Sequence, residues 1–217
     1  GRRIAFLSDR GEDEKTGLYV LDLRGGEAQP LIKTDQSISD FTLSRDGKFA
    51  ALILTESAQA DTLEKLEKTK EPLKDQDVIV VNRNDYVRDG EGIVQGQRDH
   101  LWLADLTTEK LRRLTDGEFD VAAPEFSVDG KEIFCQANLK EAGVTYNTDI
   151  FSVPADSGSA PHPKGVKDAE RGSLRQLTSN PAADMSASIS PDGKWIAYLA
   201  AERPRCYYDH QRLWIMR

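Results

Sequence analysis

The sequence has 217 residues, of which 29 are Lys or Arg and 37 are Asp or Glu, so the formal net charge is -8. An acidic chain without a basic run is a poor general binder of nucleic acid, because phosphate contacts require clustered cations. No apolar stretch approaches the ~18 residues that span a bilayer. We therefore expect neither a nucleic-acid nor a membrane partner. A hydrophobic content of 38% is enough for a core, which excludes wholesale disorder.

The chain opens on strand-like residues, 1–7 (Gly-Arg-Arg-Ile-Ala-Phe-Leu), and closes on another strand-like segment, 213–217 (Leu-Trp-Ile-Met-Arg). We expect it to be a piece of a longer polypeptide. Within it, one phrase occurs three times, at residues 44–48, 127–131 and 190–194, with the pattern Ser-x-Asp-Gly-Lys. Each copy precedes an apolar run of strand length, and internal repeats of this kind indicate a repeat architecture.

The repeated phrase predicts a tight hairpin between two antiparallel strands. In the copy at 190–194, Pro after the serine suits the start of a type I turn; Asp favours the next position, and Gly takes the left-handed one. The structural turn residues are therefore Asp46, Gly47, Asp129, Gly130, Asp192 and Gly193. The alternative is a set of calcium loops. It fails because each copy offers one carboxylate, whereas calcium needs about six or more oxygens in one place. We expect no metal and no cofactor.

A second phrase alternates with the turn, at residues 18–23, 101–106, 150–156 and 213–216. A short strand with a Leu-Thr ending follows it at residues 111–115 and 174–178, and residues 29–34 are a weaker version. The order gives four antiparallel strands per unit, which is the β-propeller blade. The strands after the turns are apolar on both faces, as a sheet between two neighbouring blades requires.

The sequence therefore predicts an all-β partial propeller of four-stranded blades. Its units are an incomplete blade at 1–35, a blade at 36–116, a blade at 117–179 and an incomplete blade at 180–217. The two complete units are longer than the ~40–50 residues of a plain blade, so both carry insertions. Since a closed propeller needs at least ~4 blades, we expect an open arc.

The first insertion runs from about residue 56 to 99. Asp61 and Glu64 resemble a capping box, and Pro72 ends the run, so residues 61–72 predict a short charged helix. That helix is either a solvated cap on a blade edge or a docking element for another domain. Residues 77–81 predict a strand and residues 82–92 a polar loop. Arg88 and Arg98 are candidate substrate-binding residues because guanidinium binds carboxylates in a bidentate manner; the alternative is salt bridges to nearby aspartates.

Cys135 and Cys206 lack the spacing of a zinc site or a disulfide framework. Cys135 is expected to be a small buried hydrophobe, and the pair favours a reducing, cytoplasmic compartment. The three histidines, His100, His162 and His210, have no serine partner, so we expect surface or structural roles for them. No Gly-x-Ser-x-Gly nucleophile motif is present, and no catalytic residue is assigned.

The combination resembles the propeller domain of the prolyl oligopeptidase family, in its acylaminoacyl-peptidase and dipeptidyl-peptidase-like branch. Residues 190–198 (Ser-Pro-Asp-Gly-Lys-Trp-Ile-Ala-Tyr) match the blade phrase, which TolB-like propellers share. The charged segment followed by 77–80, together with residues 86–92 and 98–103, is more specific to the peptidases. The resemblance covers essentially the whole chain but only the non-catalytic half of such an enzyme.

This resemblance implies an accessory domain of a serine peptidase, one that gates a buried active site and selects short peptides. It implies a C-terminal α/β-hydrolase domain in the same parent chain, short peptides as ligands, and a possible homo-oligomer. The alternative is a TolB-like or WD-type interaction scaffold with no enzyme attached. A downstream α/β segment with Gly-x-Ser-x-Gly would distinguish the two.

Overall fold

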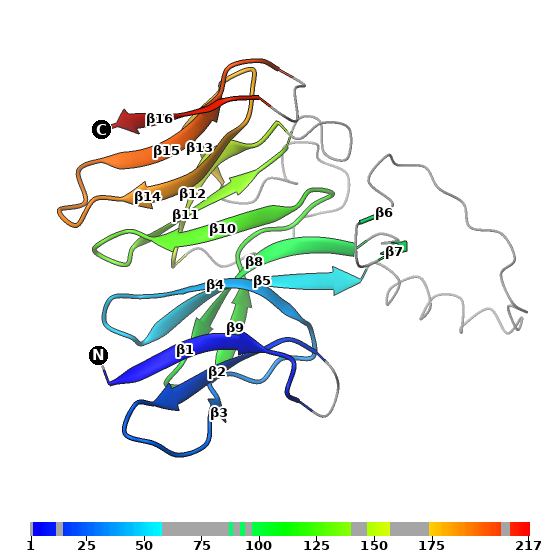
Figure 1. Cartoon of the computed structure of the whole chain (residues 1–217), viewed down its shortest axis with the longest axis vertical. Coiled ribbons are helices and arrows are strands. Elements are labelled where there is room, and N and C mark those ends of the chain that lie inside the picture. The colour runs from blue at the N-terminus through cyan, green and yellow to red at the C-terminus, as the bar shows by residue number, and fades with distance from the viewer. Residues whose placement is uncertain are drawn as a thin grey trace, which may run out of the picture.

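The computed structural model describes residues 2–11, 15–57, 87–88, 92–93, 97–139, 147–156, 174–204 and 209–217. Its described part contains strands and turns but no helix. Four antiparallel sheets of three or four strands follow one another along the chain (Figure 1). This is the all-β partial propeller that the repeat predicts. The expected helix at 61–72 and strand at 77–81 lie outside the described residues.

Three of these sheets contain consecutive strands in chain order, and in the second sheet β5 pairs with β8 because β6 and β7 form a separate two-stranded sheet. The first sheet contains β1 (Arg3–Ser8), β2 (Gly17–Asp22) and β3 (Gln29–Pro30). The second contains β4 (Ile38–Leu43), β5 (Phe49–Ser57), β8 (Gln97–Asp105) and β9 (Lys110–Arg113). The third contains β10 (Val121–Phe126), β11 (Glu132–Ala137), β12 (Asp149–Pro154) and β13 (Arg175–Gln176). The fourth contains β14 (Asp184–Ile189), β15 (Ile196–Ala201) and β16 (Gln211–Met216).

The two four-stranded sheets are complete blades, whereas each outer sheet has three strands among the described residues. Among the described residues, the first sheet contains no counterpart of the strand that precedes the Ser-x-Asp-Gly-Lys turn in the other sheets. In the described part of the fourth sheet there is no counterpart of the short strand that pairs with β8 in the second sheet and with β12 in the third.

A small ladder lies within the first insertion, where the sequence predicts only a loop. β6 (Val87–Arg88) pairs with β7 (Gly92–Ile93), and Val87 is directly opposite Ile93. In the view of Figure 1 the ladder lies beyond the end of the second sheet where β5 ends and β8 begins.

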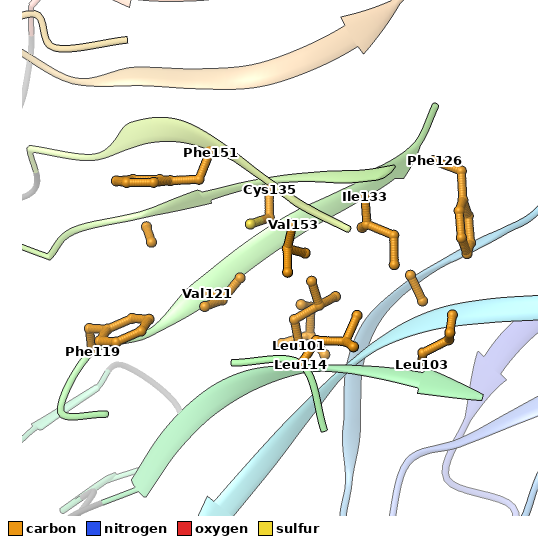
Figure 2. Packing of buried hydrophobic residues seen from close by; sticks show 13 residues of the cluster. Leu101, Leu103, Leu114, Phe119, Val121, Phe126, Ile133, Cys135, Phe151 and Val153 are labelled. Atoms are coloured by element: carbon orange, nitrogen blue, oxygen red, sulfur yellow. The ribbon is translucent and has the colours of Figure 1, made fainter. Parts of the chain in front are cut away.

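The core lies between sheets rather than within one. One cluster of buried side chains joins the second and third sheets, with Leu101 and Leu114 opposite Val121 and Val153 (Figure 2). A second cluster joins the first and second sheets around Leu18 and Ala50, among others. Sheets buried on both faces need apolar residues on both, which is why β5 and β11 have near-continuous apolar runs.

No helix among the described residues is both long enough and apolar enough to cross a membrane.

Candidate functional site

The Ser-x-Asp-Gly-Lys turn is a closed hydrogen-bonded unit. In its first copy the Gly47 amide donates to the Ser44 carbonyl at 2.8 Å, which closes the turn. The Ser44 hydroxyl donates to Asp46 Oδ1 at 2.7 Å. The same hydroxyl accepts the Phe49 amide at 2.9 Å, and Asp46 Oδ1 accepts the Lys48 amide at 3.1 Å. The serine and aspartate side chains therefore satisfy backbone groups that the reversal would otherwise leave unpaired.

The other two copies repeat this geometry. Ser127 and Ser190 donate to the aspartate two residues later at 2.7 and 2.6 Å. The three glycines, Gly47, Gly130 and Gly193, have φ of 70°, 71° and 71°, in the left-handed region that glycine adopts without penalty. In each copy the serine hydroxyl, and next the lysine amide, lowers the pKa of Asp46, Asp129 and Asp192. The sequence pattern pointed to the aspartates and glycines as turn residues. It did not point to the serine, whose hydroxyl donates one hydrogen bond and accepts another.

The Leu-Thr ending also has a structural function. The Leu114 amide donates to the Leu101 carbonyl at 2.8 Å, and the Thr115 hydroxyl accepts the Leu101 amide at 2.9 Å. The third sheet repeats both bonds: the Leu177 amide donates to the Ile150 carbonyl, and the Thr178 hydroxyl accepts the Ile150 amide. The Leu-Thr motif therefore binds both the amide and the carbonyl of one residue in the neighbouring strand, Leu101 or Ile150. These bonds lie just beyond the end of the short strand β9 or β13.

We call the end of the second sheet where β5 ends and β8 begins its insertion end, because the first insertion joins these two strands. Arg98 lies in β8 at this end, and its side chain is only 9% exposed. Its guanidinium lies 3.6 Å from the Glu118 carboxylate and 3.7 Å from that of Asp120, and Nη1 donates to the Gln97 carbonyl. Both acids belong to the loop between β9 and β10. The salt bridges that were the alternative to substrate binding are therefore present, and a substrate carboxylate would have to replace one of them.

A second charged group at this end was not anticipated. Glu56, at the end of β5, accepts the Trp102 indole N–H at 2.9 Å and pairs with Arg113 at 2.9 Å. Arg113 also pairs with Asp116 at 3.0 Å. Burial raises the pKa of Glu56, and the nearby Arg113 charge opposes that shift. Glu56, Trp102 and Arg113 fall on three neighbouring strands of the predicted blade. Their contact could not be predicted, however, because it depends on the register of those strands.

Arg88 lies in β6, directly opposite Gly92. In the view of Figure 1 its ladder lies past the end of the second sheet that contains Arg98. Both candidate arginines lie within the first insertion of the sequence, which runs from about residue 56 to 99.

His100 is buried in β8, with its residue 1% exposed. Its Nδ1 lies 3.3 Å from the Thr115 hydroxyl, and its ring meets Phe119 edge-on. Burial, and next the Arg113 charge, lowers the pKa of His100 to about 4, so the ring is neutral at pH 7. His210 is exposed, and His162 lies outside the described residues.

Cys135 is buried in β11, and burial raises the pKa of its thiol to about 12. Such a thiol is inert as a nucleophile near neutral pH. Cys206 lies outside the described residues. Within the described ranges, no three His, Cys, Asp or Glu side chains are arranged to hold a metal ion.

No model of a known protein family matches the sequence. The peptidase YuxL of Bacillus subtilis (strain 168), described as uncharacterized, is 32% identical over 156 residues, which is 72% of this chain and 22% of that protein. The chain thus matches only a small part of its curated relative.

Solved structures match the whole fold at lower identity. An acylaminoacyl peptidase of Pyrococcus horikoshii matches 100% of this chain and 29% of its own, with a TM-score of 0.61 and 14% identity. A puromycin-hydrolyzing peptidase of Mycobacterium tuberculosis matches 99% of this chain and 28% of its own, with a TM-score of 0.58 and 17% identity. TolB of Acinetobacter baumannii matches 99% of this chain and 38% of its own, with a TM-score of 0.54 and 15% identity. The chain is therefore a β-propeller segment that resembles the propeller domains of acylaminoacyl peptidases, of the prolyl oligopeptidase family more broadly, and of TolB.

Proposed function

We propose that the chain is the non-catalytic propeller portion of a serine peptidase similar to acylaminoacyl or dipeptidyl peptidases, where it gates the active site and selects short peptides. The observation that carries the proposal is the 32% identity to a peptidase over 156 residues. In this proposal the catalytic domain is a C-terminal α/β-hydrolase domain of the same parent chain. A narrow opening admits an extended peptide and excludes a folded protein, so the domain acts as a size filter.

Arg88 and Arg98 are the proposed peptide contacts. Arg98 is already paired with Glu118 and Asp120, so a peptide carboxylate would bind by exchange with one of these acids. The exchange keeps the guanidinium paired throughout, which matters because an unpaired buried charge is costly. Replacing Arg98 with Lys preserves the charge but removes the planar fork, and should raise KM of the parent peptidase more than it lowers kcat.

A second candidate function is a TolB-like interaction scaffold with no enzyme attached. It is favoured by the match of TolB to 99% of this chain. In that case the insertion end of the second blade would be a protein-binding surface.

The two candidates differ in what the full-length parent protein does. The parent, purified to homogeneity, is assayed on N-acylated chromogenic amino acids and on a series of peptides of increasing length. The peptidase proposal expects turnover that a serine-directed inhibitor abolishes and a rate that falls steeply with substrate length. The present chain is the matched control and should show no turnover. An inactive parent would contradict the proposal and favour the scaffold; an active parent indifferent to length would remove the gating function alone.

A further inference from the structure

The two acids beside Arg98 are held in different ways. The Asp120 carboxylate lies 3.7 Å from Arg98 Nη1, and its Oδ1 also accepts the Asp99 amide at 3.0 Å. Asp120 therefore has a fixed backbone partner. The Glu118 carboxylate lies 3.6 Å from Arg98 Nε, and its side chain is 80% exposed. At that distance the contact is an ion pair without hydrogen-bond geometry, and it lies at the surface, where ion pairs contribute little.

The loop that carries both acids is anchored on each side of Glu118. On one side, the buried Thr115 hydroxyl lies 3.3 Å from His100 Nδ1 and accepts the Leu101 amide. On the other side, Phe119 is only 5% exposed and belongs to the cluster between the second and third sheets, as Figure 2 shows. The backbone near Glu118 is therefore held by buried neighbours, whereas its own side chain extends into solvent. A change at this position can consequently be confined to one side chain.

Arg98 can bind a carboxylate once Glu118 turns away. A guanidinium presents the N–H groups of Nε and Nη2 along one edge, in a fork that fits both oxygens of a carboxylate. Glu118 lies on the Nε side of Arg98, and Asp120 lies on the Nη1 side. An incoming carboxylate therefore meets the Nε side without disturbing Asp120. The buried guanidinium stays paired throughout, which avoids the cost of an uncompensated charge.

The charge balance at the insertion end favours a ligand group with a single negative charge. Arg98 brings one positive charge beside the carboxylates of Glu118 and Asp120. A third carboxylate, that of Asp99, follows in β8 and accepts the Thr55 hydroxyl at 2.7 Å. A carboxylate that replaces Glu118 leaves the charge beside the guanidinium unchanged. A phosphate dianion would add a negative charge where like charges already repel.

We propose that Glu118 is an intramolecular competitor at a carboxylate site on Arg98: its side chain occupies the Nε side of the guanidinium until the carboxylate of a peptide replaces it. Asp120 stays in place and orients the guanidinium. The carboxylate comes from the C-terminus of the peptide or from an acidic side chain, since the chemistry is the same. This inference rests on the proposed function of Arg98 as a peptide contact, and it adds the ligand group and the residue that limits its binding.

Chemical modification of Arg98 in the full-length parent protein measures this exchange without any need for catalysis. Phenylglyoxal reacts with accessible arginines, and mass spectrometry of the peptides gives the modification rate at each arginine. N-acetyl-Ala-Ala with a free C-terminus should slow modification of Arg98, and its C-terminal amide should not. Protection by N-acetyl-Ala-Glu amide would show that an acidic side chain also supplies the carboxylate. Arg113, which pairs with Glu56 and Asp116, is the internal reference.

Glu118→Gln keeps the size of the side chain and removes its charge. It should lower the concentration of N-acetyl-Ala-Ala that half-protects Arg98 by about two- to five-fold, the effect of one exposed ion pair. Asp116→Asn is the matched control, because Asp116 lies in the same loop but pairs with Arg113, and it should change this concentration less. In kinetic assays of the parent peptidase, Glu118→Gln should lower KM for a free-acid peptide relative to its amide more than it changes kcat.

Three results would overturn the inference. The first is modification of Arg98 at the same rate with and without the carboxylate peptides. The second is an equal gain from Glu118→Gln and Asp116→Asn, which would mean a general effect of charge. The third is a larger gain from Asp120→Asn, which would make Asp120 the exchanged acid. A parent that is inactive but shows carboxylate protection would retain the site and contradict the peptidase function; an active parent without such protection would contradict this inference alone.

Discussion

Replacing Leu101 with alanine tests whether packing between sheets, rather than hydrogen bonding within a sheet, stabilises this chain. Leu101 is directly opposite Ile53 in the second sheet, as Leu213 is opposite Leu199 in the fourth. Leu101 has 0% exposure and lies in the cluster between the second and third sheets. Replacing a fully buried leucine with alanine removes its transfer free energy and leaves a cavity, which together cost about 3–4 kcal/mol. Leu213 has the same place in the fourth sheet with 69% exposure, so Leu213→Ala should cost less than about 0.5 kcal/mol.

The assay is urea denaturation of the chain, followed by far-UV circular dichroism at the lowest usable concentration. Leu101→Ala should lower the midpoint without changing the slope, because the denaturant slope reports the area exposed on unfolding. Leu213→Ala should leave the midpoint unchanged, and it is the matched control because strand position and residue type are the same. Equal losses in the two variants would refute the reasoning, since the face around Leu213 would then be covered in solution.

The remaining predictions concern turns, pH and association. Gly130→Val and Gly193→Val should each destabilise the chain by about 1–2 kcal/mol or more, because both residues have φ of 71° and a β-branched side chain is strained there. Gly130→Asn should destabilise the chain less. Unchanged thermal melts of both valine variants would contradict the turn geometry. Because the pKa of His100 is about 4 in the fold and about 6.5 when unfolded, the unfolded state binds the extra proton between these values. Stability should fall by about 3 kcal/mol from pH 7 to pH 4 on this account, and His100→Gln should remove that part of the slope in urea midpoints measured across the range. The exposed faces, with Ile4 at 49% and Trp214 at 51%, should drive self-association at micromolar concentration; sedimentation velocity that gives a concentration-independent monomer would show that the faces are covered.

The sequence alone was sufficient for the fold class and the turns. The Ser-x-Asp-Gly-Lys phrase encodes its structure locally, since every bond of the turn lies within six consecutive residues. Repetition of that phrase with alternating strand phrases then indicates blades, because a four-stranded unit with two apolar faces is stable only between neighbours. The apolar runs after each turn were assigned to sheets for the same reason.

Tertiary structure decided what each repeated residue does. Leu101 and Leu213 are equivalent in sequence, but one is buried and the other exposed, because burial depends on whether another sheet and strand cover the position. Arg98 is a candidate peptide contact in the sequence, but only the loop between β9 and β10 places Glu118 and Asp120 beside it. His100 is a neutral core residue for a similar reason: Phe119 and Thr115 come from later segments. Local hydrogen bonds are encoded by neighbouring residues, whereas burial and charge pairing depend on segments that only folding brings together.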